Sequence, residues 1–197
     1  MTELKNKTVF ITGSSIGIGR ETALAFAKEN CQVVVTYFKD QKEAEQTAKE
    51  CQQNGAAEVL VLPLNVMDEK SIRSCVSQTV KKFGAIDILV NNAGIVVWKD
   101  LKDQTMTEIN EQIQTNLTGL IQTTLACLPH AKQMIINIAS GAGISAYGGL
   151  APYCATKFGV RGFSQALAQE IKIPVYAINP GTIATRMNDF QGLPPIR

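Results

Sequence analysis

The sequence predicts an α/β fold built on one doubly wound parallel sheet. Two observations predict it: six short runs rich in β-branched residues alternate with longer segments of helical periodicity, and the strand runs are almost wholly apolar. A strand that is apolar throughout is buried on both faces, and right-handed crossovers place the connecting helices on those faces. We therefore expect a Rossmann-like sheet with all six strands buried and the strand order 3-2-1-4-5-6.

The first strand, Thr8 to Thr12, leads through a glycine-rich turn into a helix expected over 17–30. Glycines let backbone N–H groups approach a pyrophosphate, and the helix N-terminus adds partial positive charge. A glycine-rich run by itself is also compatible with a plain tight turn, but the strand before it and the helix after it favour dinucleotide binding. The candidate contacts are Gly13, Ser14, Ser15, Ile16, Gly17, Ile18 and Gly19.

The second strand, Val33 to Tyr37, precedes a helix expected over 40–54. A carboxylate at the end of this strand would bind the adenosine ribose and select NAD, but Tyr37 stands there, followed by Phe38 and Lys39. With no carboxylate to repel a 2′-phosphate and with Lys39 to attract it, NADP is predicted over NAD. A merely solvated Lys39 is the alternative.

The third strand, Val59 to Leu64, and the fourth, Ile86 to Asn91, frame a helix expected over 68–83. The fourth ends in Asn-Asn-Ala-Gly, at the carboxyl edge where such sheets bind ligands. A polar turn is the alternative for this motif alone. The cofactor contacts that this motif predicts are Asn92, Ala93 and Gly94. One long helix is expected next, over 104–128.

The fifth strand, Met134 to Ser140, precedes a helix expected over 153–171. In that helix Tyr153 and Lys157 are four residues apart and therefore lie on one face. Lowering a tyrosine pKa from about 10 to about 7 requires about 4 kcal/mol of selective phenolate stabilisation. A positive charge about 4 Å away, at an effective dielectric near 20, supplies about that amount. Such a pair alone is more often an ordinary helix surface. The sixth strand, Val175 to Asn179, follows.

Composition restricts the classes of partner. The 197 residues, 45% hydrophobic and 18% charged with net charge +2, fit one domain over residues 1–197 and contain no basic run that could follow nucleic acid. No apolar run reaches the roughly 20 residues that a membrane span needs, and no secretory signal opens the chain, so a cytoplasmic protein is expected. Five scattered cysteines and one histidine indicate reduced thiols and no metal site.

From about Lys7 to Met187 the chain resembles the short-chain dehydrogenase/reductase (SDR) family. The resemblance rests on a set of motifs in the family's order: the glycine-rich turn, Asn-Asn-Ala-Gly, Ser140, Tyr153, Lys157 and Asn-Pro-Gly. The resemblance implies hydride transfer between NADP(H) or NAD(H) and a small carbonyl or alcohol substrate. It makes Tyr153 the general acid, or the base in reverse. Lys157 would hold the nicotinamide ribose and lower the tyrosine pKa, and Ser140 would hydrogen-bond the substrate oxygen.

The resemblance adds further assignments. Asn116 would position a relay water through its backbone carbonyl, and Asn65, in place of the usual aspartate, would contact adenine beside Val66. Residues expected against the nicotinamide carboxamide are Pro180, Gly181, Thr182 and Thr185. The helices over 104–128 and 153–171 would form the interface of a homodimer or homotetramer.

The C-terminus departs from the family pattern. Family members usually continue past Pro180-Gly181 with a helix pair and a seventh strand, so we expect a truncated chain whose tail, 190–197, is loop. The resemblance implies that substrate specificity lies mainly in the loop after Pro180-Gly181, which is short or missing here, so neither the substrate nor the reaction direction is predicted. A catalytically silent dinucleotide-binding regulator and a sugar-nucleotide epimerase or dehydratase are the alternatives, disfavoured respectively by the intact catalytic set and by the Gly-x-x-x-Gly-x-Gly spacing.

Overall fold

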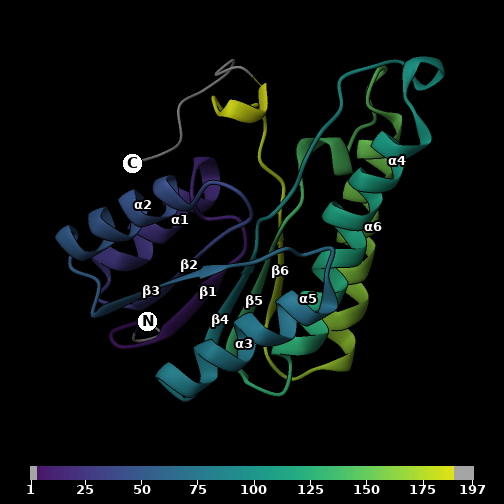
Figure 1. Ribbon diagram of the computed structural model, residues 1–197. Coiled ribbons are helices and arrows are strands. Elements are labelled where there is room, and N and C mark those ends of the chain that lie inside the picture. Colours follow the sequence, from purple (N-terminus) through teal and green to yellow (C-terminus); the bar gives the residue numbers. More distant parts are fainter. Residues whose placement is uncertain (1–3, 189–197) are drawn as a thin grey trace.

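The computed structural model describes residues 4–188, and the expected loop at 190–197 lies outside them. All six strands form one parallel sheet in the predicted order β3-β2-β1-β4-β5-β6 (Figure 1). The strands are β1 (Thr8–Ile11), β2 (Gln32–Tyr37), β3 (Glu58–Pro63), β4 (Ile86–Asn91), β5 (Ala131–Ile138) and β6 (Val175–Ile178). The α-helices are α1 (Gly17–Lys28), α2 (Gln41–Gln53), α3 (Glu69–Phe83), α4 (Met106–Ile113), α5 (Gly119–Cys127) and α6 (Ala151–Glu170).

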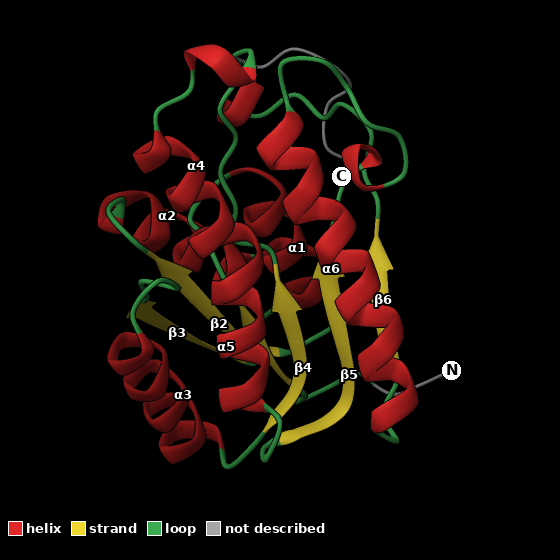
Figure 2. Cartoon of the chain, turned by 90° about the vertical axis from the view of Figure 1, so that its right-hand side faces the viewer, coloured by secondary structure: helices red, strands yellow, loops and turns green. Residues whose placement is uncertain are grey.

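Alternate residues of the central strands enter two separate cores. Val9 and Ile11 of β1 pack with small residues of α1 and α2 on one face. Phe10, between them, packs on the other face against a core that includes residues of α3, α5 and α6. Figure 2 shows these three helices across the same face of the sheet. The central strands are therefore buried on both sides, as a parallel sheet requires.

The expectation that all six strands are buried is wrong for β6. Tyr176 and Ile178 are 51% and 46% exposed. In register they follow Ile136 and Ile138, on the face that α1 and α2 cover. These two helices lie over the opposite half of the sheet, so within residues 4–188 this face of β6 has no helix over it (Figure 1).

The single helix expected over 104–128 is divided. A π-helical turn, η2 (Gln114–Thr118), separates α4 from α5, and α4 begins only at Met106. π-turns inside helices are concentrated at functional sites. Here the turn carries Asn116, whose buried amide bonds to the backbone of Ile95. Hydrophobic periodicity carries no information about a hydrogen bond between one side chain and a distant backbone group. The sequence therefore predicted one uninterrupted helix.

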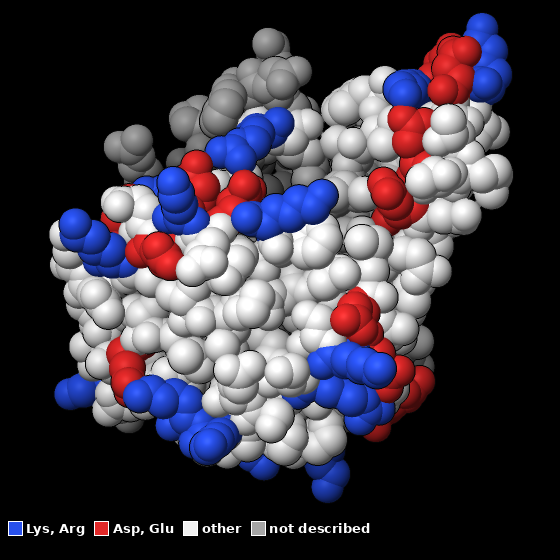
Figure 3. All heavy atoms as spheres, viewed as in Figure 1, with Lys and Arg blue, Asp and Glu red and all other residues white. Residues whose placement is uncertain are grey.

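Charged side chains are spread over the surface. On the face shown in Figure 3, basic and acidic side chains are interspersed, and most of the surface between them is uncharged. All five cysteines are buried and form no disulfide. No helix within the described part of the chain combines the length and apolar character needed to span a membrane.

Candidate active site

A cleft of about 1320 Å³ opens at the carboxyl ends of the strands, where the loops after all six strands meet. The cofactor motifs line one part of it and the Ser-Tyr-Lys set another. Most predicted site residues thus come together in one place.

The glycine-rich turn forms the floor of the cofactor part. Gly13 and Gly17 have φ values of +63° and +61°, a region that side chains rarely adopt. A Cβ on Gly13 would lie 3.1 Å from Cα of Ala93, so the glycine also permits close approach of two loops. The N-terminus of α1 has no side-chain cap and no acidic residue in its first turn. Its N–H groups and its partial positive charge are suited to the pyrophosphate of a dinucleotide.

Asn-Asn-Ala-Gly holds this turn in place. The Asn92 amide donates to the carbonyl oxygens of Thr12 and Gly13, at 3.0 and 2.8 Å. The Thr12 hydroxyl oxygen accepts from the backbone N–H groups of Asn92 and Ala93, both at 2.9 Å. Asn91 points elsewhere, into a buried network with Asn137. The second asparagine of the motif therefore acts on the cofactor turn.

The end of β2 differs in part from expectation. Phe38, Lys39 and Asp40 line the cleft, whereas Tyr37 is absent from its wall and packs against the core under α1 and α2. Tyr37 is the last residue of β2, where the contact was expected, but the alternation of side chains along the strand turns it toward the core. Arg186, which the sequence did not single out, places its guanidinium 3.5 Å from an Asp40 oxygen and 3.2 Å from a Glu43 oxygen.

Ser140, Tyr153 and Lys157 share one part of the cleft wall. Ser140 lies two residues beyond β5, where its hydroxyl oxygen accepts from the Ala142 N–H at 3.1 Å and starts a short 3-10 turn. Tyr153 lies in the first turn of α6, after Pro152, and Lys157 lies one turn later. Proline is favoured in the first helical turn because its missing N–H is not needed there.

The electrostatics of this set differ from expectation. Burial raises the pKa of Tyr153, and a hydrogen bond with Ser140 opposes the rise. Burial lowers the pKa of Lys157 to about 8. The lysine donates to the Ile138 carbonyl at 2.9 Å and its Nζ lies 5.6 Å from the centre of the tyrosine ring. The predicted lowering of the tyrosine pKa by Lys157 is therefore not found, because burial is the largest influence on the tyrosine pKa and raises it.

Three other predicted residues stand behind the cleft wall. Ser14 is fully buried, where its hydroxyl donates to Ile11 and accepts from the Thr36 N–H. A Cβ on Gly19 would lie 2.4 Å from the Gly13 carbonyl oxygen, so this glycine serves close packing. Asn116 is buried, and its amide donates to Thr156 at 3.2 Å as well as pairing with Ile95.

The remaining predicted contacts line the cleft with several residues that the sequence reasoning missed. The predicted ones are Ser15, Ile16, Ile18, Asn65, Val66, Gly94, Pro180, Gly181, Thr182 and Thr185. The missed ones include Ile95, Val96, Met67, Tyr147, Leu150, Ile183, Arg186 and Met187. Most follow a predicted motif directly, so the loop after each strand was the available signal. Trp98 also lines the cleft.

The chain is similar to known dehydrogenases and reductases over nearly its whole length. The short chain dehydrogenase family profile matches residues 7–193. A 3-oxoacyl-[acyl-carrier-protein] reductase of Synechocystis sp. is 36% identical over 203 residues, which cover 100% of this chain and 82% of that protein. An NADP-dependent 3-hydroxy acid dehydrogenase of Schizosaccharomyces pombe is 34% identical over 95% of this chain and 76% of its own.

The fold matches as well. The crystal structure of levodione reductase superimposes with a TM-score of 0.88 at 30% identity, covering 93% of this chain and 74% of that one. The family profile and these relatives span nearly the whole chain, including the glycine-rich turn and the Tyr-x-x-x-Lys helix. The chain belongs to the short-chain dehydrogenase/reductase family and is an NAD(P)-dependent oxidoreductase.

Proposed function

We propose that the chain reduces a carbonyl group to an alcohol with Tyr153 as the proton donor. The observation that carries the proposal is the convergence of Ser140, Tyr153 and Lys157 on the cleft into which the glycine-rich turn and the α1 N-terminus also face. When bound, the nicotinamide supplies hydride to the carbonyl carbon. The chain's own task is to hold the carbonyl oxygen and protonate it.

The burial of Tyr153 is consistent with this direction. Because burial raises its pKa, the phenol keeps its proton at neutral pH and can donate it to the substrate oxygen. The Ser140 hydroxyl, which acts on Tyr153 to oppose the rise of its pKa, would donate to the same oxygen and stabilise the charge that develops there. Lys157 would hold the nicotinamide ribose, and the buried Asn116 would order the relay between α6 and the loop after β4.

NADP is the proposed cofactor. Support comes from Lys39, which lines the cleft at the end of β2 and has no carboxylate before it at Tyr37 or Phe38. Asp40 lines the same region, but its charge is opposed by Arg186 at 3.5 Å. Lys39 has no ion-pair partner among the described residues and is the positive charge that a 2′-phosphate would meet. The S. pombe relative is named as NADP-dependent.

Two relatives suggest the substrate class, since their names place a carbonyl or hydroxyl at carbon 3 of an acyl chain. We propose 3-oxoacyl compounds as the first substrates. The apolar side chains of Val96, Trp98 and Leu150 on the cleft wall suit an aliphatic chain.

The protein is proposed to act as a homodimer or homotetramer in the cytoplasm. Met106 of α4, Leu125 of α5 and Phe158 of α6 are exposed large apolar residues on the helices expected at the interface. Buried free thiols are in keeping with a reducing compartment.

The test is oxidation of NADPH, with NADH in parallel, across ketones, 3-oxoacyl thioesters, quinones and sugars, comparing wild type with Tyr153→Phe. We expect turnover of 3-oxoacyl thioesters and a loss of about 10²- to 10⁴-fold in the variant, the usual contribution of a general acid. Cofactor binding without turnover of any carbonyl would instead indicate a regulator. Action on nucleotide sugars without net cofactor change would indicate an epimerase.

A further inference from the structure

Residues 95–99 follow β4 along the cleft and belong to no strand, and side chains of α4 and η2 hold their backbone. The Asn116 amide accepts from the Ile95 N–H and donates to the Ile95 carbonyl, both at 2.8 Å. The Gln112 oxygen accepts from the Val97 N–H at 3.2 Å. Glu108 pairs with the Lys99 ammonium. We call Glu108, Gln112 and Asn116 the side-chain ladder.

The spacing of the ladder matches the segment it holds. Its members are four residues apart, which is about 6 Å along an α-helix. Their partners, Ile95, Val97 and Lys99, are two residues apart, which is about 6.6 Å in an extended chain. The helix can therefore contact every second residue of the segment in register. The intervening residues, Val96 and Trp98, line the cleft.

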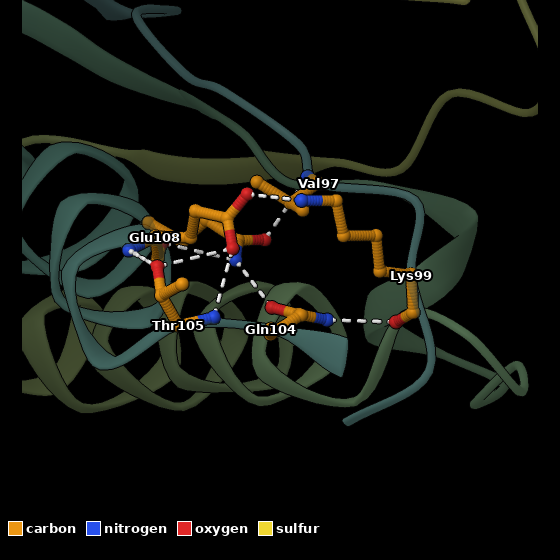
Figure 4. A network of polar contacts seen from close by, with 6 residues as sticks. Val97, Lys99, Gln104, Thr105 and Glu108 are labelled. Atoms are coloured by element: carbon orange, nitrogen blue, oxygen red, sulfur yellow. Dashed lines mark hydrogen bonds and ion pairs between the residues drawn. The ribbon is translucent and has the colours of Figure 1, made fainter. Parts of the chain in front are cut away.

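Gln112 is the central member and is fully buried. Its Nε2 donates to the Gln104 side-chain oxygen at 3.0 Å and to the Glu108 carbonyl at 3.2 Å. Gln104 in turn donates to the Lys99 carbonyl at 2.8 Å (Figure 4). Both N–H groups of the buried Gln112 amide therefore donate hydrogen bonds and its oxygen accepts one, which leaves a single lone pair of the oxygen unused. A buried amide is costly unless satisfied, so packing alone would be served better by an apolar residue.

The outer end of the ladder is charged. Hydrogen bonds from Lys99 and from the Thr105 N–H lower the pKa of Glu108 to about 2, so its carboxylate is ionised at neutral pH. Thr105 and Glu108 also form a capping box at the start of α4. The Lys99 N–H donates to the Gly149 carbonyl at 3.1 Å, which links the segment to the loop that carries Tyr147 and Leu150. Both loops line the cleft.

We propose that Gln112 is a positioning residue that sets the place of Val96 and Trp98 in the substrate part of the cleft. The proposal rests on the proposed function for its substrate. The glycine-rich turn and Lys39 belong to other loops, and Asn92 is held by the carbonyls of Thr12 and Gly13 rather than by the ladder. Gln112 therefore acts on the carbonyl compound and leaves dinucleotide binding nearly unchanged.

The first experiment compares Gln112→Met with Gln114→Met, the same substitution at an exposed position of the same helical run. With acetoacetyl-N-acetylcysteamine as the probe, Gln112→Met should raise KM about tenfold, because Val97 loses its acceptor. We expect kcat and the Kd for NADPH to change less than about twofold, the pattern of lost ground-state positioning. Gln114→Met should match wild type. Equal KM values in the two variants, or a loss shared by NADPH binding, would overturn the proposal.

The second measurement needs no turnover. Trp98 is the only tryptophan of the chain, so its fluorescence reports on this wall directly. Gln112→Met should lower its anisotropy and increase its quenching by acrylamide, whereas Gln114→Met should leave both as in wild type. If no carbonyl compound is turned over, the proposed function fails while this comparison still decides the role of Gln112. Unchanged Trp98 signals would overturn that role.

Glu108→Gln covers the case in which Gln112→Met does not fold. Glu108 is exposed enough to substitute safely, and glutamine preserves the capping box while it removes the ion pair with Lys99. The anisotropy of Trp98 should fall in this variant, by less than in Gln112→Met. Anisotropy and KM equal to wild type in Glu108→Gln would contradict the ladder.

Discussion

At the residue scale, burial favours the neutral form of both Tyr153 and Lys157. It raises the pKa of the phenol and lowers the pKa of the ammonium group to about 8. In the proposed mechanism, carbonyl reduction uses the protonated phenol, whereas alcohol oxidation uses the phenolate as base. The fraction of phenolate rises with pH, and so should kcat/KM for oxidation.

This pH dependence is the first prediction. Profiles between about pH 6 and about pH 10 should show oxidation rising with pH throughout and reduction staying nearly constant, because the raised pKa keeps the phenol protonated over this range. The profiles are measured with 3-hydroxybutyryl-N-acetylcysteamine and its 3-oxo counterpart. Thermal unfolding at each pH controls for loss of folded protein. An oxidation profile that is flat throughout would argue against Tyr153 as the titrating base.

Lys39 offers a second prediction at this scale. It is exposed at the cofactor end of the cleft, where it would meet the 2′-phosphate. Lys39→Ala should weaken NADPH binding about fivefold, since an exposed ion pair contributes up to about 1 kcal/mol, and leave NADH binding unchanged. Lys42→Ala, on α2 and outside the cleft lining, is the matched control. The measurement is a fluorescence titration with each dinucleotide, and equal effects on both would contradict NADP preference.

At the element scale, α1 approaches the carboxyl ends of the strands closely because Gly19 has no Cβ atom. A Cβ on Gly19 would lie 2.4 Å from the Gly13 oxygen and 2.5 Å from the Asn92 amide nitrogen. Gly19→Ala should therefore destabilise the protein by roughly 1–3 kcal/mol and weaken dinucleotide binding. Gly162→Ala, in α6 with nothing within 4 Å of its Cβ, should be neutral or stabilise by up to about 1 kcal/mol. Urea unfolding compares them, and equal stabilities would refute the packing argument.

The same scale shows what the sequence could predict. The parallel sheet and its order follow from apolar strands between helices, because connection handedness leaves few topologies. The π-turn at Asn116 could not be predicted, because the Asn116 side chain hydrogen-bonds to the backbone of Ile95, twenty-one residues away. Gln112 was missed for the same reason: its partners are a distant N–H and a neighbouring side chain.

Predictability of the site follows a similar division. Ser140 and Lys157 were found because a motif fixes their spacing, and the structure brings both to the cleft. Arg186 was not found, because its partners Asp40 and Glu43 are known only once the loop after β6 crosses to α2. The cleft contact was predicted at Tyr37, whereas the next residue, Phe38, lines the cleft. Neighbouring residues of a strand point to opposite faces, so a shift of one residue exchanges the cleft for the core.

At the scale of the whole molecule, buried thiols dominate the response to alkaline pH. Burial raises the pKa of Cys31 to about 11 and those of Cys51 and Cys75 to about 12, and it raises the pKa of Cys127 as well. A thiol with a raised pKa stabilises the fold below its unfolded pKa of 9.0 and loses that contribution as pH rises toward the folded value. Lys157 acts in the opposite sense between about pH 8 and 10.5, because the folded protein releases that proton first.

Four thiols outweigh one lysine, so the free energy of unfolding should fall above pH 9, with a slope near pH 10 of about three protons, or about 4 kcal/mol per pH unit. Tyr153, whose pKa is also raised, adds to the fall above pH 10. Urea unfolding at several pH values from about 7 to about 10.5 measures it. Cys51→Ala combined with Cys75→Ala removes two of the four thiols and should reduce the slope by about two protons, whatever it does to stability at neutral pH. A stability that stays constant or rises above pH 9 would show that the thiols ionise in the folded protein and that these cysteines are not shielded by the two cores.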